Sequence, residues 1–558
     1  MTDTPARIPT PIDAIAERWV DTVADLLPEV GVYIGRQSRP GEYSDLSPAG
    51  ADARADAARA VLTELRAAEP VDEVDRITKL DLERDLALEL ERHDARLNMR
   101  DVSVLASPAQ EIREVFDLEA TDTVADWEVV GRRLHNVRGA IDGYIESLRE
   151  GIRQGVVPAR RQVAQVITQA ERTAASDGFF TDLTSDPRAG DEAVPAALAA
   201  DLVAGAEEAR AAYGTLIGFL RDELAPAAGE QDAVGREHYA LASRYFLGAT
   251  VDLDETYEWG LEELARMVAE QESIANEIRP GATVEEAIAL LDEDPARKLH
   301  GTEALKTWMQ ETSDRAVADL AASHFDIPEP VRRLECLIAP SQDGIIYYTG
   351  PTDDFSRPGR MWWSVPPGVT EFNTWRELTT VYHEGVPGHH LQIGQAVYNR
   401  ASLNAWRRTL AGTSGHAEGW ALYAERLMEQ LGYLDDPADR LGMLDGQRMR
   451  AARVVLDIGV HLGKPRPDGE GIWTGDWAFE FFARHVHMSQ GFIDFEVNRY
   501  LGWPGQAPSY KIGQRIWEQL RDEVAEREGD AFDIKAFHKR ALDIGGVGLD
   551  TLRTALLD

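Results

Sequence analysis

The stretch Val381-Tyr-His-Glu-Gly-Val-Pro-Gly-His-His-Leu-Gln392 decides how the chain is interpreted. It carries a His-Glu pair followed by two more histidines, residue types that bind a metal ion and supply a general base. In the H-E-x-x-H pattern the two histidines lie four positions apart on one helix face, so both reach one zinc ion. Here two extra residues separate them, because His389 follows His383 by six positions and His390 by seven.

A regular helix cannot bring these histidines together. Residue i+6 lies roughly 240° around the helix from residue i, and residue i+7 lies about 10.5 Å along its axis. The intervening segment is unusual, however, because Val386-Pro387 is flanked by glycines, and proline and glycine permit a helix to loop out and resume. We therefore predict a distorted helix at Pro387, with His389 as the second metal ligand and His390 as the alternative.

The next helical stretch, Ser414-Gly-His-Ala-Glu-Gly-Trp-Ala-Leu-Tyr-Ala-Glu425, offers a third ligand. Glu418 lies far enough downstream of His389 for the first helix to end and a second to run back beside it. A zinc site with a catalytic water needs such a third protein ligand. Glu425 falls on the same helix face as Glu418 two turns on, which suits a carboxylate that holds an imidazole N–H. His416 is a weaker candidate for a place beside the metal.

Helical patterns dominate the rest of the chain, with apolar residues three and four positions apart. Only one region has the β-branched and aromatic composition of strands, at residues 333–339, 344–349 and 360–365. Residues 340–343 are expected to join the first two strands as a hairpin. The fold class expected is mainly α, a large multi-helix body with a deep cleft and one small antiparallel β-sheet before the helix of His383. Residues 1–325 would form one wall of the cleft and residues 326–558 the metal-binding region, as one continuous unit.

Composition excludes several classes of partner. The formal charge of −39 over 558 residues disfavours nucleic acid and anionic membrane surfaces. The first residues, Met1-Thr-Asp-Thr-Pro-Ala-Arg7, lack the pattern of a secretory signal, and no run approaches the roughly 20 apolar residues that span a bilayer. Cys336 is the only cysteine and is expected to be a buried thiol. These features predict a cytoplasmic protein, and a homodimer is left open.

Three motifs resemble those of a known family. His383-Glu-Gly-Val-Pro-Gly-His-His390 resembles the signature of the bacterial proteins grouped as domain of unknown function 885. Gly415-His-Ala-Glu-Gly-Trp-Ala-Leu-Tyr-Ala-Glu425 and Trp503-Pro-Gly-Gln-Ala-Pro-Ser-Tyr-Lys-Ile-Gly513 are similar to that family's other two hallmarks. That family is similar, at greater distance, to the helical zinc peptidases of the thermolysin-like clan, the gluzincins. The resemblance implies peptidase chemistry with a zinc oligopeptidase- or carboxypeptidase-like fold.

The residues themselves indicate roles for a catalytic site. Glu384 would act as general base on a zinc-activated water. Tyr510, in a Gly/Pro-rich turn, would stabilise the oxyanion. Arg499, with Lys511 as a weaker partner, could clamp a peptide carboxylate. An edge strand that carries Tyr347 and Tyr348 could pair with an extended substrate.

Three functions remain open from the sequence. The first is a zinc metallopeptidase for short peptides, of dipeptidase, carboxypeptidase or oligopeptidase type. The second is a metal-dependent hydrolase of another amide or ester, and the third is a degenerate protein that binds a peptide or metal without catalysis. The retained Glu384 speaks against the third, since ligation alone does not require it. One Zn²⁺ is expected, and Mn²⁺ or Co²⁺ could occupy the same ligands.

Overall fold

Long helices form where apolar residues recur at helical spacing and a capping side chain precedes them. In the computed structural model, which describes residues 7–341 and 346–558, helix α6 (Val124–Gln154) is an example. Thr123 and Asp126 form a capping box at its start, and Gly155 ends it in the left-handed conformation. The mainly helical fold predicted from the sequence is confirmed.

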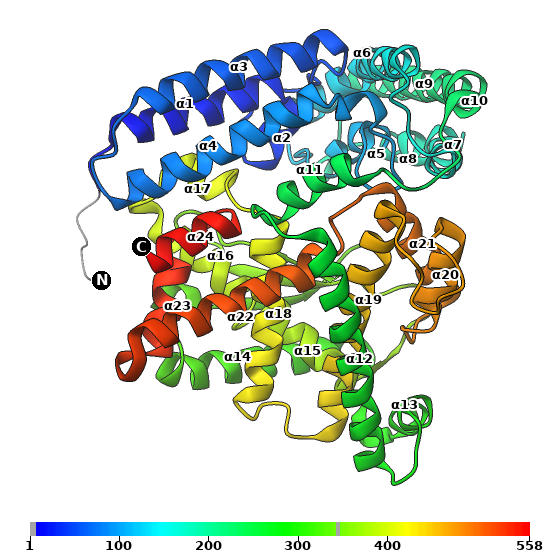
Figure 1. Ribbon diagram of the computed structural model, residues 1–558. Coiled ribbons are helices and arrows are strands. Elements are labelled where there is room, and N and C mark those ends of the chain that lie inside the picture. The colour runs from blue at the N-terminus through cyan, green and yellow to red at the C-terminus, as the bar shows by residue number, and fades with distance from the viewer. Residues whose placement is uncertain (1–6, 342–345) are drawn as a thin grey trace.

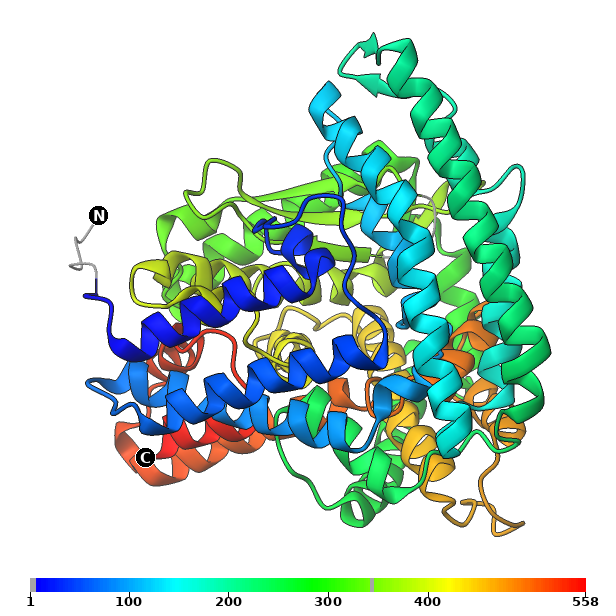
Figure 2. The same ribbon diagram turned by 90° about the horizontal axis from the view of Figure 1, so that it is seen from above.

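The N-terminal helices form an upper layer with an arm that projects from it (Figures 1 and 2). The layer contains α1 (Pro11–Leu26), α2 (Pro28–Tyr33), α3 (Pro48–Ala67) and α4 (Glu73–Asp94). The arm contains α5 (Pro108–Glu114), α6, α7 (Arg160–Ala174), α8 (Phe179–Leu183), α9 (Ala196–Phe219) and α10 (Ala225–Ala227), with β1 (Arg188–Ala189) pairing β2 (Glu192–Ala193). The arm has an apolar core of its own, whereas the core of the layer also includes Ala405 and Trp406 from the lower body.

The lower body holds the largest apolar core, in which α12 packs along α19 and α18 along α22. That core combines residues from both sides of residue 325. Its helices are α11 (Arg236–Leu247), α12 (Leu253–Ile278), α13 (Val284–Glu293), α14 (Thr302–Ser323), α15 (Thr374–Glu384), α16 (His389–Tyr398), α17 (Ala405–Thr409), α18 (Ser414–Gln430), α19 (Pro437–Leu462), α20 (Gly475–Ala483), α21 (Gln490–Gly502), α22 (Ser509–Glu528), α23 (Ile534–Asp543) and α24 (Leu549–Leu557).

A small three-stranded sheet precedes the helix of His383, as expected, but its strand order corrects one prediction. Strand β6 (Gly359–Trp363) lies between β4 (Leu334–Ile338) and β5 (Ile346–Thr349), parallel to β4 and antiparallel to β5. The hairpin predicted between β4 and β5 is therefore wrong. The physical reason is burial, because β6 alternates buried and half-buried residues and takes the centre, whereas β5 is half-buried throughout and lies at the edge. Residues 342–345 of the predicted turn lie outside the described residues.

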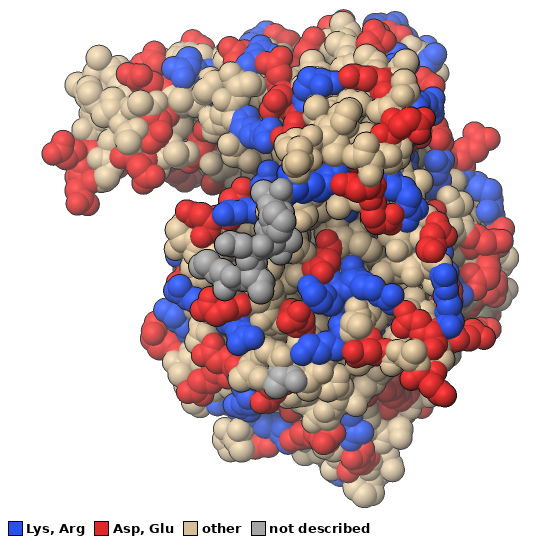
Figure 3. Space-filling model, turned by 90° about the vertical axis from the view of Figure 1, so that its left-hand side faces the viewer, with Lys and Arg blue, Asp and Glu red and all other residues tan. Residues whose placement is uncertain are grey.

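A second sheet pairs β3 (Lys298–His300) with β7 (Glu371–Asn373), directly before α15. Cys336 on β4 is buried, as predicted, and burial raises the pKa of its thiol to about 11. In the described ranges, no helix combines the length and apolar character needed to cross a bilayer. The face in Figure 3 is hollowed beneath the upper layer, and acidic and basic side chains are interspersed on it.

Candidate metal centre

The helix that begins at Thr374 is interrupted where the sequence predicts. Helix α15 ends at Glu384 and α16 begins at His389, with a cis peptide bond between Val386 and Pro387. The chain turns so tightly that a Cβ on Gly388 would lie 1.8 Å from the carbonyl oxygen of His383. Only glycine fits there. The indole N–H of Trp420 on α18 donates to the carbonyl of Pro387 at 2.8 Å and fastens the loop.

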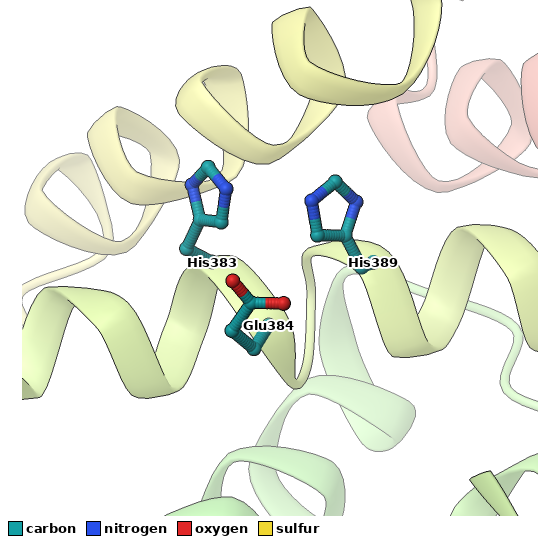
Figure 4. Close-up of side chains that lie close together, drawn as sticks. All are labelled: His383, Glu384 and His389. Atoms are coloured by element: carbon teal, nitrogen blue, oxygen red, sulfur yellow. The ribbon is translucent and has the colours of Figure 1, made fainter. Parts of the chain in front are cut away.

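This interruption brings the two imidazoles to the same side (Figure 4). The rings of His383 and His389 are nearly perpendicular, with centroids 4.9 Å apart. Ligand atoms of these two residues and of Glu384 all lie within 4.8 Å of one another. Glu418 comes from α18 and places Oε2 3.3 Å from Nε2 of His383 and 3.6 Å from Nε2 of His389. Four residues from three helices, His383, Glu384, His389 and Glu418, thus form one cluster.

A chain of buried hydrogen bonds begins at Nδ1 of His383. Its Nδ1 donates to Oε1 of Glu425 at 2.8 Å, which leaves Nε2 to face Glu418. Gln447 on α19 donates to the other oxygen of Glu425 at 3.3 Å and accepts from Nζ of Lys511 at 2.6 Å. Lys511 in turn pairs with Glu263 at 2.9 Å. The orientation of His383 therefore depends on residues from α12, α18, α19 and α22.

Burial and nearby charges shift pKa values within this cluster. Burial raises the pKa of Glu384, against the charges of His389 and His383. Burial would lower the pKa of His383, but Glu418 and Glu425 outweigh it and raise that pKa to about 10. Burial would raise the pKa of Glu418, and the two histidines instead hold it well below its ordinary value. Carboxylates and imidazoles are thus arranged around a point that favours positive charge.

The donor set fits a divalent cation. Donors around a tetrahedral zinc ion lie roughly 3.3 Å apart, given zinc–ligand distances of about 2.0–2.1 Å. The separations from Glu418 Oε2 to the two Nε2 atoms, 3.3 and 3.6 Å, agree with that spacing. In the described part of the chain this buried Oε2 has no hydrogen-bond partner. His383, His389 and Glu418 would hold the ion, and Glu384 lies close enough to act on a water beside it.

Two other histidines are engaged elsewhere. Nε2 of His390 donates to the carbonyl of Val331 at 2.7 Å, and its Nδ1 accepts from the Tyr348 hydroxyl at 3.0 Å. Since both ring nitrogens are occupied, His389 and not His390 faces Glu418. His416 bonds Gln392 at 3.3 Å and lies against Trp517, so its contacts are not with the imidazoles of the cluster.

The residues predicted to bind substrate divide into two groups. Tyr510, at the start of α22, is half-buried, and burial together with the charge of Glu418 raises its pKa to about 12. It therefore lies near the cluster as a protonated donor. Arg499 and Lys511 form the second group, because both contact other side chains of the protein. Arg499 donates to Glu496 at 2.8 Å and to Gln506 at 2.6 Å, and its Nε is buried without a partner. The Lys511 ammonium is buried and lies against three acceptors, on Gln447, Gln514 and Glu263.

Tyr347 and Tyr348 lie on the edge strand β5, as predicted. Tyr347 stacks on Trp362 of β6 with ring centroids 6.2 Å apart. Tyr348 instead contacts His390 from the opposite face. The two side chains thus lie on opposite faces of β5, as successive residues of a strand do.

Arg450 is a residue that the sequence analysis missed. It lies on α19, with its Cζ 6.0 Å from the ring centroid of Tyr510. Burial raises the pKa of Glu384 and of Tyr510, and the charge of Arg450 works against the rise in both. A cavity of about 430 Å³ also went unpredicted. It lies between the upper layer and α11, and its lining includes Arg92, Arg100 and Trp503 but none of the cluster residues.

A mainly helical protein with a His-Glu-His cluster and a second carboxylate on a neighbouring helix is the class that fold and site define. Within that class, a family model described as "Bacterial protein of unknown function (DUF885)" matches residues 28–556, so the chain belongs to this family. Among curated proteins, none matches the chain.

Two solved structures share the fold over nearly the whole chain. One, from Colwellia psychrerythraea, has a TM-score of 0.84 and 21% identity and covers 98% of each chain. The other, from Shewanella oneidensis, has a TM-score of 0.77 and 17% identity and covers 98% of this chain and 100% of its own. A carboxypeptidase of Pyrococcus furiosus is similar only loosely, with 13% identity and a TM-score of 0.38 over 99% of this chain and 96% of its own.

The first two of these proteins correct the predicted location. Each is described as a "putative lipoprotein", and a lipoprotein is held at a membrane by its lipid and is not free in the cytoplasm. The prediction of a cytoplasmic protein is therefore wrong. That prediction relied on the single cysteine and on the first seven residues, and neither feature determines the location of a protein.

Proposed function

We propose that the protein is a zinc-dependent metallopeptidase that hydrolyses short peptides. The observation that carries this proposal is the position of Glu418 Oε2, 3.3 Å from His383 Nε2 and 3.6 Å from His389 Nε2, with Glu384 beside them. Two imidazoles and one carboxylate are a ligand set of catalytic zinc sites, which keep a further position open. When bound, the cation supplies a Lewis acid that polarises a carbonyl and lowers the pKa of water.

The chain's own residues supply the proton transfers. Burial raises the pKa of Glu384, which makes its carboxylate a stronger base than an exposed one. Glu384 would take a proton from the attacking water and deliver it to the departing amine. Tyr510, whose raised pKa keeps its hydroxyl protonated, would donate a hydrogen bond to the developing oxyanion.

Metal content and turnover of three variants test the proposal. His383→Ala and Glu418→Ala should each lose the metal from the purified protein, because each removes one of three ligands. Glu384→Gln should keep the metal and lower the hydrolysis of a peptide library at least 1,000-fold, consistent with removal of a general base. Glu429→Ala is the matched control, since Glu429 lies on α18 with Glu418 but pairs with Arg426. It should keep both metal and activity.

Each alternative has its own outcome. A wild-type protein that binds no divalent metal would exclude any metal-dependent hydrolase. Metal retained without cleavage of any peptide would direct the search to other amides and esters. Manganese or cobalt in place of zinc would leave the assignment of the ligands intact, because the same nitrogen and oxygen donors bind all three ions.

A further inference from the structure

We propose that Arg450 binds the free C-terminal carboxylate of the substrate, so that the enzyme removes only one or two residues from the C-terminal end of peptides. This inference rests on the proposed peptidase function. Two other arginines near Tyr510 are already hydrogen-bonded to side chains of the protein. Arg453 pairs with Glu496 at 2.7 Å and with the Tyr500 hydroxyl at 2.6 Å, and Arg499 pairs with Glu496 and Gln506.

Arg450 differs from these two neighbours. In the described ranges its guanidinium has no carboxylate oxygen within 4.0 Å, whereas both neighbours pair with Glu496. Its buried Nε has no hydrogen-bond partner, which is also true of Nε of Arg499. The side chain is half-buried, so it remains accessible to a small ligand. A guanidinium carries donors that match the two oxygens of a carboxylate. A partly desolvated guanidinium without a carboxylate partner is a ready binding group for such an anion.

The position of the guanidinium depends on a glycine one turn earlier in α19. Arg450 folds back over Gly446, and a Cβ on Gly446 would lie 2.6 Å from Nη1. Gly446 therefore makes room for the guanidinium in this orientation. Glycine in a helix interior costs roughly 0.5–1 kcal/mol relative to alanine. This placement gives a reason for a glycine at that position.

The distance to the reacting groups sets the length of the segment that can be released. Arg450 Cζ lies 6.0 Å from the ring centroid of Tyr510, the proposed donor to the scissile carbonyl. One extended residue spans about 3.3–3.6 Å. A terminal carboxylate held by Arg450 is thus one or two residues beyond the bond that is cut. In a molecule with a formal charge of −39, this cation also provides local attraction for an anionic substrate end.

Matched peptides test the assignment. The substrates are acetyl-Ala-Ala-Ala with a free carboxylate and the same peptide as its C-terminal amide, so only the terminal charge differs. Wild type should prefer the acid by about 100-fold in kcat/KM, the discrimination expected from one close charge pair. Arg450→Met should abolish the preference, because the rate on the acid should fall about 100-fold further than the rate on the amide.

Two further variants separate this role from a structural one. Gly446→Ala keeps the charge but displaces the guanidinium, so it should reduce the preference about 10-fold without lowering the melting temperature. Arg440→Met is the matched control on the same helix, because Arg440 pairs with Glu277 at the surface and should leave the preference unchanged.

The outcomes distinguish this proposal from the one it rests on. Equal losses on acid and amide in Arg450→Met would overturn the assignment, because the guanidinium would then act on the reaction itself or on Glu384. A wild type that cuts the amide as fast as the acid would overturn it while the peptidase stands. If neither peptide is cut, the peptidase proposal fails, and calorimetric binding of the two peptides to wild type decides on Arg450. Equal affinities, or no binding of either peptide, would exclude it.

Discussion

His383 is held between two carboxylates with different tasks, and this makes Glu425 a testable residue. Glu425 accepts from Nδ1 at 2.8 Å, whereas Glu418 faces Nε2. Glu425→Gln can keep the hydrogen bond but loses the charge that increases the basicity of the imidazole. We expect zinc affinity to fall about 10–100-fold, as is typical when a partner of a ligating histidine is changed. Competition titration with a chromogenic chelator measures this.

Glu429→Gln on the same helix provides the control for that experiment and should leave the affinity unchanged. An unaltered affinity in Glu425→Gln would mean that the orientation of His383 is fixed by packing alone. The hydrogen-bond chain from Glu425 through Gln447 to Lys511 would then not contribute to zinc affinity.

Asp457 is a buried carboxyl outside the metal centre that predicts a pH dependence of stability. It accepts from the Tyr239 hydroxyl at 2.7 Å and from the backbone N–H of Gly505 at 2.8 Å. Burial raises its pKa from 3.8 to about 7, against these hydrogen bonds. Because the folded state binds the proton of Asp457 more tightly than the unfolded state does, protonation stabilises the fold. This stabilisation is complete below pH 3.8 and is lost as pH rises through about 7.

Asp457→Asn removes that titration and keeps an oxygen as acceptor. The melting temperature of the variant should therefore fall less between pH 5 and pH 8 than that of wild type. The difference corresponds to free energies on the order of a few kcal/mol. Thermal unfolding at the two pH values measures it, and parallel profiles for the two proteins would contradict the assignment.

Among the structural elements, the loop between α15 and α16 predicts the largest effect of a single methyl group. In Gly388→Ala the added Cβ would meet the backbone oxygen of His383 at 1.8 Å, and backbone cannot move aside as a flexible side chain can. We expect a loss of about 3 kcal/mol or more in stability, together with loss of the bound metal. Thermal unfolding and metal analysis of the purified variant measure both.

Gly214→Ala in α9 is the control for that loop. A Cβ at this position would meet nothing within 4 Å, so the variant should keep its metal and gain about 0.5–1 kcal/mol. A Gly388→Ala protein that melts and binds metal like wild type would show that the loop can rearrange without moving His383 or His389.

The same loop shows how far the sequence can be used to predict this site. Proline and glycine restrict the backbone locally, so the break at Pro387 followed from residue types alone. The order of the strands did not follow, because the central position of β6 depends on which strand faces the core. Sequence neighbours β4 and β5 both pair with β6 and not with each other.

Charged side chains were the least predictable elements of the site. Arg499 and Lys511 were predicted to clamp a peptide carboxylate because of their charge, yet both contact buried acidic or amide partners. Arg450 carries no motif, and its position depends on the space above Gly446 and on Tyr510 from another helix. Pairing between helices is a tertiary property, and one sequence does not specify it.

At the scale of the whole molecule, the metal-binding region shares its core with helices that precede it. Helix α12 approaches α19 closely, since a Cβ on Gly260 would lie 2.9 Å from Cγ1 of Val454. Leu264, Met267 and Ile274 of α12 are buried in the same core. At about 2 kcal/mol for each buried side chain, these three alone contribute roughly 6 kcal/mol. That value is comparable with the total stability of many proteins, about 5–15 kcal/mol.

A fragment of residues 326–558 should therefore not fold by itself, although it contains all the proposed metal ligands. Without α12, the apolar face of α19 is exposed, and Lys511 loses Glu263, whose buried pairing helps to orient Gln447 and Glu425. We expect a broad thermal transition and no tight zinc binding in the fragment. Co-expression with residues 1–325 should restore both, because the missing helices then return to the shared core. A sharp transition and stoichiometric zinc in the fragment alone would instead show that α12 is dispensable and that the metal-binding region is an independent domain.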